Sequence, residues 1–358
     1  MTRLPLALLL TLLLSACSTF KPVTTTRFNP PATRAELPHE EAVHPKNSLE
    51  WWYLTGHLRD QATGEEFGIE YVFFHFNLRD GKTDYQMVNV AITDPKGQKF
   101  NYDYKLRKLP RLLTDSLPLR LRERKDGQIW SFDGQEGKYQ FEAALTGKQN
   151  TGYALNLSTT PTKPVLLHGG TGYENYGEGI VAGYYSYPRL ATTGTLTVGG
   201  KTHQVTGELW YDRQWNCGSV VSKDVGWDWL SIQLDEPREE LMINTLRNAK
   251  TGQTLQQRYL QQRHQPEHRP HRPGLHAHAP HVLDQPQIQE NLPRQVARAA
   301  SRPGLRPGSG APGAPARSWP CASSTPSPCT TGKACAKVTG THNGQPVTGK
   351  AYVEITNR

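Results

Sequence analysis

Between residues 47 and 255, apolar and polar residues alternate in short runs, and this period of two constrains the fold more than any other feature. Side chains of a β-strand point alternately to its two faces, so such runs predict strands with one buried face. Gly, Asp, Asn or Pro bounds most of them, and no useful stretch with helical spacing appears in this region. The clearest runs are 48–58, 66–76, 85–92, 130–135, 152–159, 193–198, 203–212 and 228–235.

Evenly spaced strands of this kind predict an all-β barrel or sandwich. With 358 residues, the chain is long enough to bury two cores. We expect residues 41–218 to form an N-terminal domain and residues 219–358 a C-terminal domain. The alternation returns at 336–358, where the pair Asn343-Gly344 predicts a hairpin turn.

The N-terminus has the pattern of an exported bacterial lipoprotein. Arg3 precedes the apolar run LPLALLLTLLL, which is too short for a comfortable membrane span. The tetrapeptide LSAC resembles a lipobox, which predicts removal of residues 1–16 and lipid attachment to Cys17. Ser18 indicates sorting to the outer membrane, facing the periplasm, and residues 17–40 are a predicted tether. An ordinary cleaved signal peptide with an unrelated Cys is the alternative.

Residues 256–334 differ in composition from the rest of the chain. They contain 13 of the 27 Pro, and their nine Arg, one Lys and three acidic residues carry +7 of the net charge of +9. Because the positive charge is confined to this segment, it does not indicate a nucleic-acid partner. Five of the 14 residues in HRPHRPGLHAHAPH (268–281) are His, a composition that permits metal binding.

Two explanations account for this segment. One is a disordered basic insert. The other is that residues 258–334 are translated from the wrong reading frame, and we favour it. With free choice of synonymous codons, a one-base shift of 258–298 can give continuous strand-like text, and a two-base shift of 328–333 can give LYYWEG. The histidine tract is then a translation artefact, so we place no metal there and expect no cofactor.

Motifs outside this segment resemble those of one family, the AttH/CrtC family of secreted hydrolase-like lipoproteins related to carotenoid 1,2-hydratase. The resemblance covers about residues 40–255 and 336–356. In the shifted frame, the W-T-S-P, Y-P-x-x-W and Y-W-E-G motifs of that family also reappear. The motifs are NSLEWWYLTGHL (47–58), KPVLLHGGTGYENYG (163–177), GELWYDRQWN (207–216) and GWDWLSIQLDEPREELMINTLR (226–247).

The resemblance implies two lipocalin-like β-barrel domains, the second incomplete or disordered over about 258–334. An apolar, isoprenoid-like ligand would bind in or between the barrels. Carotenoid hydratases add water to a terminal isoprenoid double bond, so a hydro-lyase activity is implied. A hydrolase-like activity stays open, although no G-x-S-x-G motif supplies a serine nucleophile. The alternative is a non-enzymatic accessory lipoprotein of an ABC export system, which would act as a carrier or scaffold for the permease.

Asp212, within LWYDRQW, is the candidate acid, since an Asp in a comparable motif of the hydratases is a candidate for that role. A carboxyl group in an apolar pocket has a raised pKa and stays protonated near neutrality. An ion pair with Arg213 or Arg189 would instead lower that pKa. The chain also departs from the hydratases, which tend to have an Asp-His-Asn-like sequence in place of DRQW.

Tyr187 is the second candidate catalytic residue, because its hydroxyl could reach a ligand or Asp212. For His75 and His168 we expect structural or surface roles. Several aromatic residues are candidates for ligand binding, although packing in a core is the commoner fate of such side chains. These candidates are Trp51, Tyr184, Tyr185, Trp210, Trp215, Trp227 and Trp229.

Sequencing the gene across codons 250–340 tests the reading frame. We expect single-base differences that bring WTSP and YYWEG into frame and remove both the histidine tract and most of the positive charge. An unchanged sequence would exclude a sequencing error, and the second barrel would then be broken by a frameshift in the gene itself or carry a basic insert.

Overall fold

The computed structural model describes most of the chain outside its N-terminus and the basic segment. The predicted signal peptide, Cys17, residues 17–33 of the tether and the histidine tract lie outside the described residues. No helix in the described part is long and apolar enough to cross a membrane. The described residues are 34–45, 47, 49–77, 84–109, 113, 115–176, 180–217, 225–262, 331–342 and 344–356.

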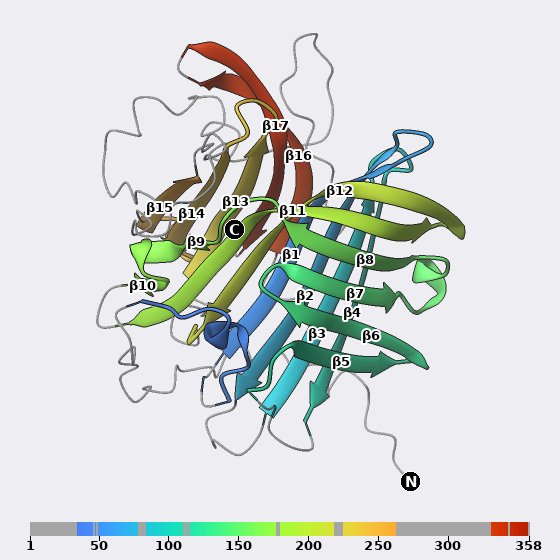
Figure 1. Cartoon of the computed structure of the whole chain (residues 1–358), viewed down its shortest axis with the longest axis horizontal. Helices are drawn as coiled ribbons and strands as arrows, with labels where there is room; N and C mark the ends of the chain where they lie inside the picture. Colours follow the sequence, from blue (N-terminus) through green and yellow to red (C-terminus); the bar gives the residue numbers. More distant parts are fainter. Residues whose placement is uncertain are drawn as a thin grey trace, which may run out of the picture.

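Two antiparallel sheets form the described chain (Figure 1). The first has the strand order β4-β3-β2-β1-β12-β11-β8-β7-β6-β5, with the short strands β9 and β10 paired to β11. Its strands are β1 (Leu49–Asp60), β2 (Glu66–Asn77), β3 (Asp84–Asp94), β4 (Lys99–Lys108), β5 (Leu119–Lys125), β6 (Gln128–Gln135), β7 (Lys138–Ala144), β8 (Ala154–Pro161), β9 (Leu166–Leu167), β10 (Tyr173–Asn175), β11 (Val181–Val198) and β12 (Lys201–Trp215).

The second sheet has the order β15-β14-β13-β17-β16. Three short 3-10 helices complete the described structure, so the prediction of an all-β fold is confirmed. The second sheet consists of β13 (Val225–Leu234), β14 (Glu240–Asn248), β15 (Thr254–Gln262), β16 (Thr331–His342) and β17 (Gln345–Thr356), and the helices are η1 (His39–Glu41), η2 (Lys148–Asn150) and η3 (His168–Gly170).

Each of the eight alternating runs overlaps an observed strand. The predicted hairpin is also present, because His342 at the end of β16 pairs with Gln345 at the start of β17. Gly344 in the turn has a φ of 78°, a conformation that glycine adopts without strain. Residues 258–262 and 331–334, the two ends of the suspected out-of-frame segment, lie in β15 and β16, and residues 263–330 lie outside the described residues.

The first sheet curls into a nearly closed barrel, in which β5–β8 cross in front of β1–β4 (Figure 1). Its interior is a packed core rather than an open chamber, since side chains from both layers are fully buried against one another. Tyr71 crosses the interior from β2 and donates a hydrogen bond to the Ser131 carbonyl oxygen of β6 at 2.9 Å. Fully buried aromatic side chains of this core include Trp52, Phe73, Trp130, Phe132, Phe141 and Tyr211.

Polar side chains close the barrel where its edge strands β4 and β5 meet. Glu123 of β5 is 3% exposed and accepts hydrogen bonds from Arg107 Nε at 2.9 Å and Gln86 Nε2 at 3.0 Å. Lys125 of β5 forms an ion pair with Asp103 of β4. Side-chain bonds therefore replace a backbone ladder at this seam.

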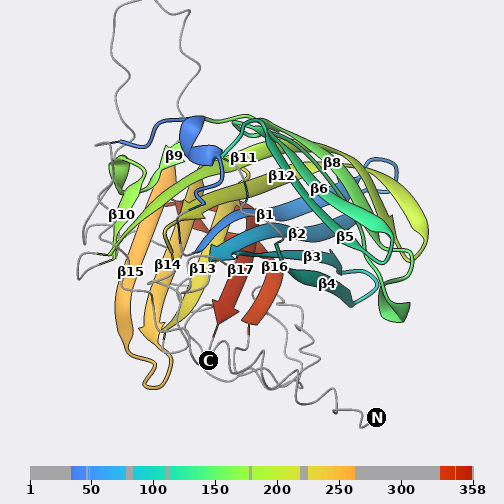
Figure 2. The same ribbon diagram turned by 90° about the horizontal axis from the view of Figure 1, so that it is seen from below.

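The second sheet covers the outer face of β1, β2, β11 and β12 (Figure 2). Both sheets contribute to one apolar cluster, which we call the interface cluster. Its buried members are Tyr53, Val72, Leu166, Tyr184, Trp210, Trp229, Met242, Leu260, Cys335 and Tyr352, bordered by the partly exposed Trp51, Phe74 and Trp227.

The seam provides a test of how the barrel is closed. We expect Glu123→Ala to lower the free energy of unfolding by about 2 kcal/mol, because it removes one of the two acceptors of the buried Gln86 amide and the acceptor of Arg107. Urea denaturation measures this change. Glu142→Ala on the exposed face of β7 is the control and should change stability by less than about 0.5 kcal/mol. Equal effects of the two substitutions would contradict a stabilising seam.

Candidate active site

The alternation of β11 and β12 divides the predicted site residues between two faces. Ser186 of β11 pairs with Asp212 of β12, and both side chains point toward the second sheet, as those of Tyr184 and Trp210 do. The next residue on each strand points the other way, into the barrel core. Asp212 therefore lies at the boundary between the two sheets.

Three donors surround the Asp212 carboxylate. Ser186 Oγ donates to Oδ1 at 2.5 Å, Trp210 Nε1 donates to Oδ1 at 2.6 Å, and Tyr184 Oη donates to Oδ2 at 2.7 Å. The residue is only 2% exposed. The site thus offers a carboxyl group held in one orientation and largely removed from water.

Burial raises the pKa of Asp212 to about 6, against an ordinary value of 3.8. The hydrogen bonds from Ser186, Tyr184 and Trp210 act in the opposite direction, since they stabilise the carboxylate. A fraction of the carboxyl groups is therefore protonated near neutral pH. This balance suits a general acid, which must be protonated at the start of a reaction and stable after losing its proton.

His168 in η3 lies behind this carboxyl group. Its Nε2 atom is 2.8 Å from Ser186 Oγ, and its ring stacks on that of Tyr184 with 3.4 Å between centroids. Burial, with a smaller contribution from the positive charge of Arg258, holds the pKa of His168 well below its usual range. His168 is therefore neutral.

Aromatic rings line the side of the site toward the second sheet. The Trp229 ring meets Trp210 edge-on at 6.3 Å and Tyr53 edge-on at 5.8 Å. Trp229 Nε1 is buried and has no hydrogen-bond partner in the described part of the chain. The faces of such rings can stabilise a cation, and the free indole N–H can donate to a polar group of a ligand.

Neither arginine that could have neutralised Asp212 pairs with it. Arg213 Nη2 bonds Glu50 at 2.5 Å inside the barrel, with its guanidinium carbon 4.2 Å from the centre of the Trp52 ring. Arg189 pairs with Glu240 and Glu208 at the other end of the interface. The carboxyl group of Asp212 keeps its raised pKa because both cations are used elsewhere.

Comparisons with known proteins assign the chain to a family. A family model described as AttH-like matches residues 29–300. The chain belongs to the AttH-like family. No curated protein matches it.

Two crystal structures similar to this AttH-like chain support the fold. An AttH protein from Nitrosomonas europaea is 23% identical, with a TM-score of 0.59 over 91% of this chain and 98% of that one. Kievitone hydratase from Nectria haematococca is 13% identical, with a TM-score of 0.52 over 93% of this chain and 95% of that one. At these identities the likeness concerns the fold alone.

The structure brings together only part of the predicted site. Among the candidate ligand-binding residues, Tyr184, Trp210 and Trp229 lie in the interface cluster with Asp212, and Trp51 and Trp227 border it. By contrast, Tyr185, Tyr187 and Trp215 lie in the barrel core, on the opposite face of the same strands. The Tyr187 hydroxyl therefore points away from the carboxyl group of Asp212.

A second buried carboxyl group lies inside the barrel and was not predicted from sequence. Glu41 of η1 is fully buried, accepts hydrogen bonds from Tyr139 Oη and, at 2.6 Å, from the Glu136 backbone N–H, and has Tyr211 Oη 3.5 Å away. Burial raises its pKa to about 7. No periodic run or motif covers Glu41, so only the three-dimensional arrangement reveals it.

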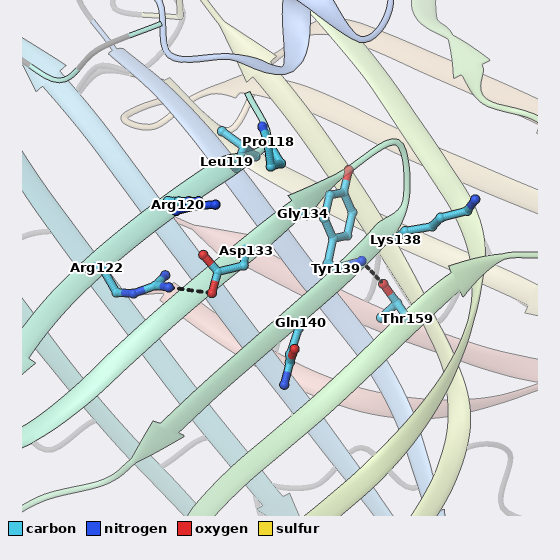
Figure 3. Close-up of a pocket in the computed structure, with 10 residues that line it drawn as sticks. All are labelled: Pro118, Leu119, Arg120, Arg122, Asp133, Gly134, Lys138, Tyr139, Gln140 and Thr159. Carbon is cyan, nitrogen blue, oxygen red and sulfur yellow. Dashed lines mark hydrogen bonds and ion pairs between the residues drawn. The ribbon is translucent and has the colours of Figure 1, made fainter. Parts of the chain in front are cut away.

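An open groove of about 550 Å³ lies over β5–β8 (Figure 3). Its polar lining includes the ion pair between Arg122 and Asp133, at 2.6 Å, and the hydrogen bond from the Tyr139 N–H to Thr159 Oγ1. None of the predicted site residues lines it. Among the described residues, no group of His, Cys, Asp or Glu side chains could hold a metal ion, and Cys217 and Cys335 are both buried.

The raised pKa of Glu41 predicts a pH dependence of stability. The folded protein binds this proton more tightly than the unfolded chain does, so the contribution of Glu41 is largest below pH 4.5 and falls as the pH rises toward about 7. The free energy of unfolding of Glu41→Gln, relative to that of the wild type, should therefore rise by about 3 kcal/mol from pH 4.5 to pH 8. Urea denaturation at the two pH values measures this gain.

The exposed residue Glu36 provides a matched control on the same segment. Glu36→Gln should keep the pH dependence of the wild type. If Glu41→Gln also keeps it, Glu41 is not a proton-binding group of the folded core.

Proposed function

We propose that this protein binds an apolar, isoprenoid-like molecule beside the interface cluster and that Asp212 protonates a carbon–carbon double bond of that ligand. The observation that carries this proposal is the buried Asp212 carboxyl group, which is hydrogen-bonded by three donors and is not paired with any arginine among the described residues. The fold shared with kievitone hydratase is consistent with hydratase chemistry. The reaction would be a hydro-lyase reaction, with hydrolase-like chemistry as the less supported variant.

The proposed reaction balances without a cofactor. The Asp212 O–H bond breaks, and its proton forms a C–H bond with one alkene carbon, which leaves a carbocation at the other carbon. A water molecule attacks that carbocation to form the C–O bond. The carboxylate of Asp212 then takes one proton from the added water and becomes the acid again.

The surroundings of Asp212 match both charges that this reaction creates. The donors Ser186, Tyr184 and Trp210 stabilise the carboxylate once the proton has left. The rings of Trp210 and Trp229 lie beside Asp212, and their faces can stabilise the carbocation. The partly exposed Trp51, Phe74 and Trp227 border the cluster, so we place ligand access along them.

The second candidate function is that of a non-enzymatic carrier. In this proposal, the protein is a lipoprotein anchored in the outer membrane through Cys17, faces the periplasm, and hands an apolar cargo to the permease of an ABC export system. The feature that favours it is the extent of the apolar interface cluster, which can bind a hydrophobic molecule without any reaction.

Asp212→Asn separates the two candidates. If the protein is a hydratase, incubation with a panel of terminal isoprenoid alkenes in ¹⁸O-labelled water gives labelled alcohols, detected by mass spectrometry. We expect Asp212→Asn to lower kcat/KM at least about 100-fold, the usual minimum for loss of a general acid. The wild-type rate should fall as the pH rises through about 6, because the acid form is lost there.

Asp235→Asn, on an exposed residue, is the matched control and should leave turnover unchanged. Alkene binding by the wild type, measured from the fluorescence of the tryptophans, is followed in parallel. Binding that survives Asp212→Asn, with no labelled alcohol from the wild type, would contradict the hydratase and support the carrier.

A further inference from the structure

Three buried side chains form a continuous hydrogen-bonded chain from η3 to the candidate acid. His168 Nε2 lies 2.8 Å from Ser186 Oγ, and Ser186 Oγ lies 2.5 Å from Asp212 Oδ1. His168 and Ser186 are fully buried, and Asp212 is 2% exposed. Because water does not compete for these groups, each hydrogen bond affects the next one.

The positions of the protons in this chain follow from what each group can donate. An ionised carboxylate only accepts hydrogen bonds, so the single O–H of Ser186 points to Asp212. Ser186 Oγ must then accept from His168, which requires the proton of the neutral imidazole to be on Nε2. His168 Nδ1 is left as a bare acceptor, and it has no hydrogen-bond partner among the described residues. Burying an acceptor without a partner costs less free energy than burying an N–H group without one. This cost therefore also favours the tautomer with its proton on Nε2.

We propose that His168 is a positioning residue for the acid site: its Nε2–H bond to Ser186 directs the Ser186 hydroxyl onto Asp212 and so favours the ionised carboxylate. This inference rests on the proposed role of Asp212 as the acid. It assigns to His168 an indirect role, through Ser186, and no contact with the substrate.

His168 also supports the second oxygen of the carboxylate. Its ring lies on the ring of Tyr184, 16° from parallel, and the Tyr184 hydroxyl donates to Asp212 Oδ2 at 2.7 Å. The backbone holds His168 in place, since its carbonyl oxygen accepts from the Gly172 N–H at 2.7 Å. One imidazole thus orients a donor to each carboxylate oxygen.

The charges around the chain keep this arrangement neutral at His168. Arg258 of β15 and burial both disfavour the imidazolium, whose positive charge would otherwise hold the nearby carboxyl group in its ionised form. On the other side, the negative charge of Glu354 on β17 opposes ionisation of Asp212. Among the described residues, Glu174 and Tyr176 are further titratable groups beside Tyr184. A neutral His168 therefore orients Ser186 without abolishing the acid.

The titration of Asp212 itself tests this inference without any substrate. The full chain is labelled with [γ-¹³C]Asp, the Asp212 signal is assigned by its loss in Asp212→Asn or Asp212→Glu, and its chemical shift is followed against pH. We expect Ser186→Ala to raise the midpoint by about one pH unit, or about tenfold in proton affinity, because one donor to the carboxylate is lost. His168→Phe keeps a ring on Tyr184 but removes the N–H, and should raise the midpoint by a smaller amount.

Two further variants show whether His168 acts through Ser186. In the double variant His168→Phe/Ser186→Ala, the midpoint should equal that of Ser186→Ala alone, because His168 then has no hydroxyl to orient. His168→Gln, whose amide N–H replaces Nε2–H but which has no ring to stack on Tyr184, should bring the midpoint back toward the wild-type value, and it remains informative if His168→Phe does not fold. Thr192→Val removes another buried hydroxyl of β11, which donates to the Leu190 carbonyl oxygen, and should leave the titration unchanged.

An unchanged midpoint in a folded His168→Phe variant would overturn the inference. An equal shift in the presence and absence of the Ser186 hydroxyl would also overturn it, since His168 would then act directly on Asp212. The proposed function fails separately: if the midpoints move as expected but no alkene is hydrated, the positioning of Asp212 stands and the hydratase does not.

Discussion

Asp212 and Arg213 are neighbours in the sequence, and the pleat of β12 places them on opposite faces of the first sheet. A carboxylate and a guanidinium on the same face would form an ion pair, which would lower the pKa of Asp212 and keep it ionised. The pleat instead directs Arg213 to Glu50 in the barrel core and leaves Asp212 with neutral donors at the sheet interface. The acid character of the site depends on this separation.

The separation is secure because the interior of the barrel fixes the register of β12. Arg213 bonds Glu50 of β1 and the Ala42 carbonyl oxygen, and its guanidinium lies against the Trp52 ring. A shift of β12 by one residue would move Arg213 to the other face of the sheet and break its buried ion pair with Glu50. Breaking a buried pair is strongly destabilising. The charged groups inside the barrel therefore hold Asp212 and its neutral donors in place on the other face.

The sequence predicts much of the fold and part of the site. Period-two runs identify eight strands, and they place Trp210 and Asp212 on one face of a strand, as observed. Strand β4 was not predicted, because its inward side chains, such as Asp103 and Arg107, are polar and form the seam of the barrel. An edge strand with polar residues on its inner face has no apolar alternation to detect.

Which of the neighbouring tyrosines reaches Asp212 depends on pairing rather than composition. The β11 ladder is regular from Gly183 to Tyr187 and shifts register between Tyr187 and Leu190, so only pairing with β12 shows which hydroxyls face the second sheet. His168 is harder still to predict, because it lies in the short helix η3, outside the strands, and meets Ser186 across 18 residues of sequence. A single sequence shows which residue types could form such a contact, but not that they lie close together in the fold.

Glu41 and Asp212 both have raised pKa values and lie on opposite sides of the first sheet, yet they are not equivalent as acids. Glu41 is closed inside the barrel core, where hydrogen bonds from Tyr139 and the Glu136 backbone N–H and the positive charge of Arg213 stabilise an ionised carboxylate. Asp212 has three side-chain donors and lies against a cluster whose rim is partly exposed. A general acid has to release its proton to a ligand and recover it from water. The partly exposed rim of the interface cluster fits the proposed role of Asp212 better than the closed barrel core would fit Glu41 in that role.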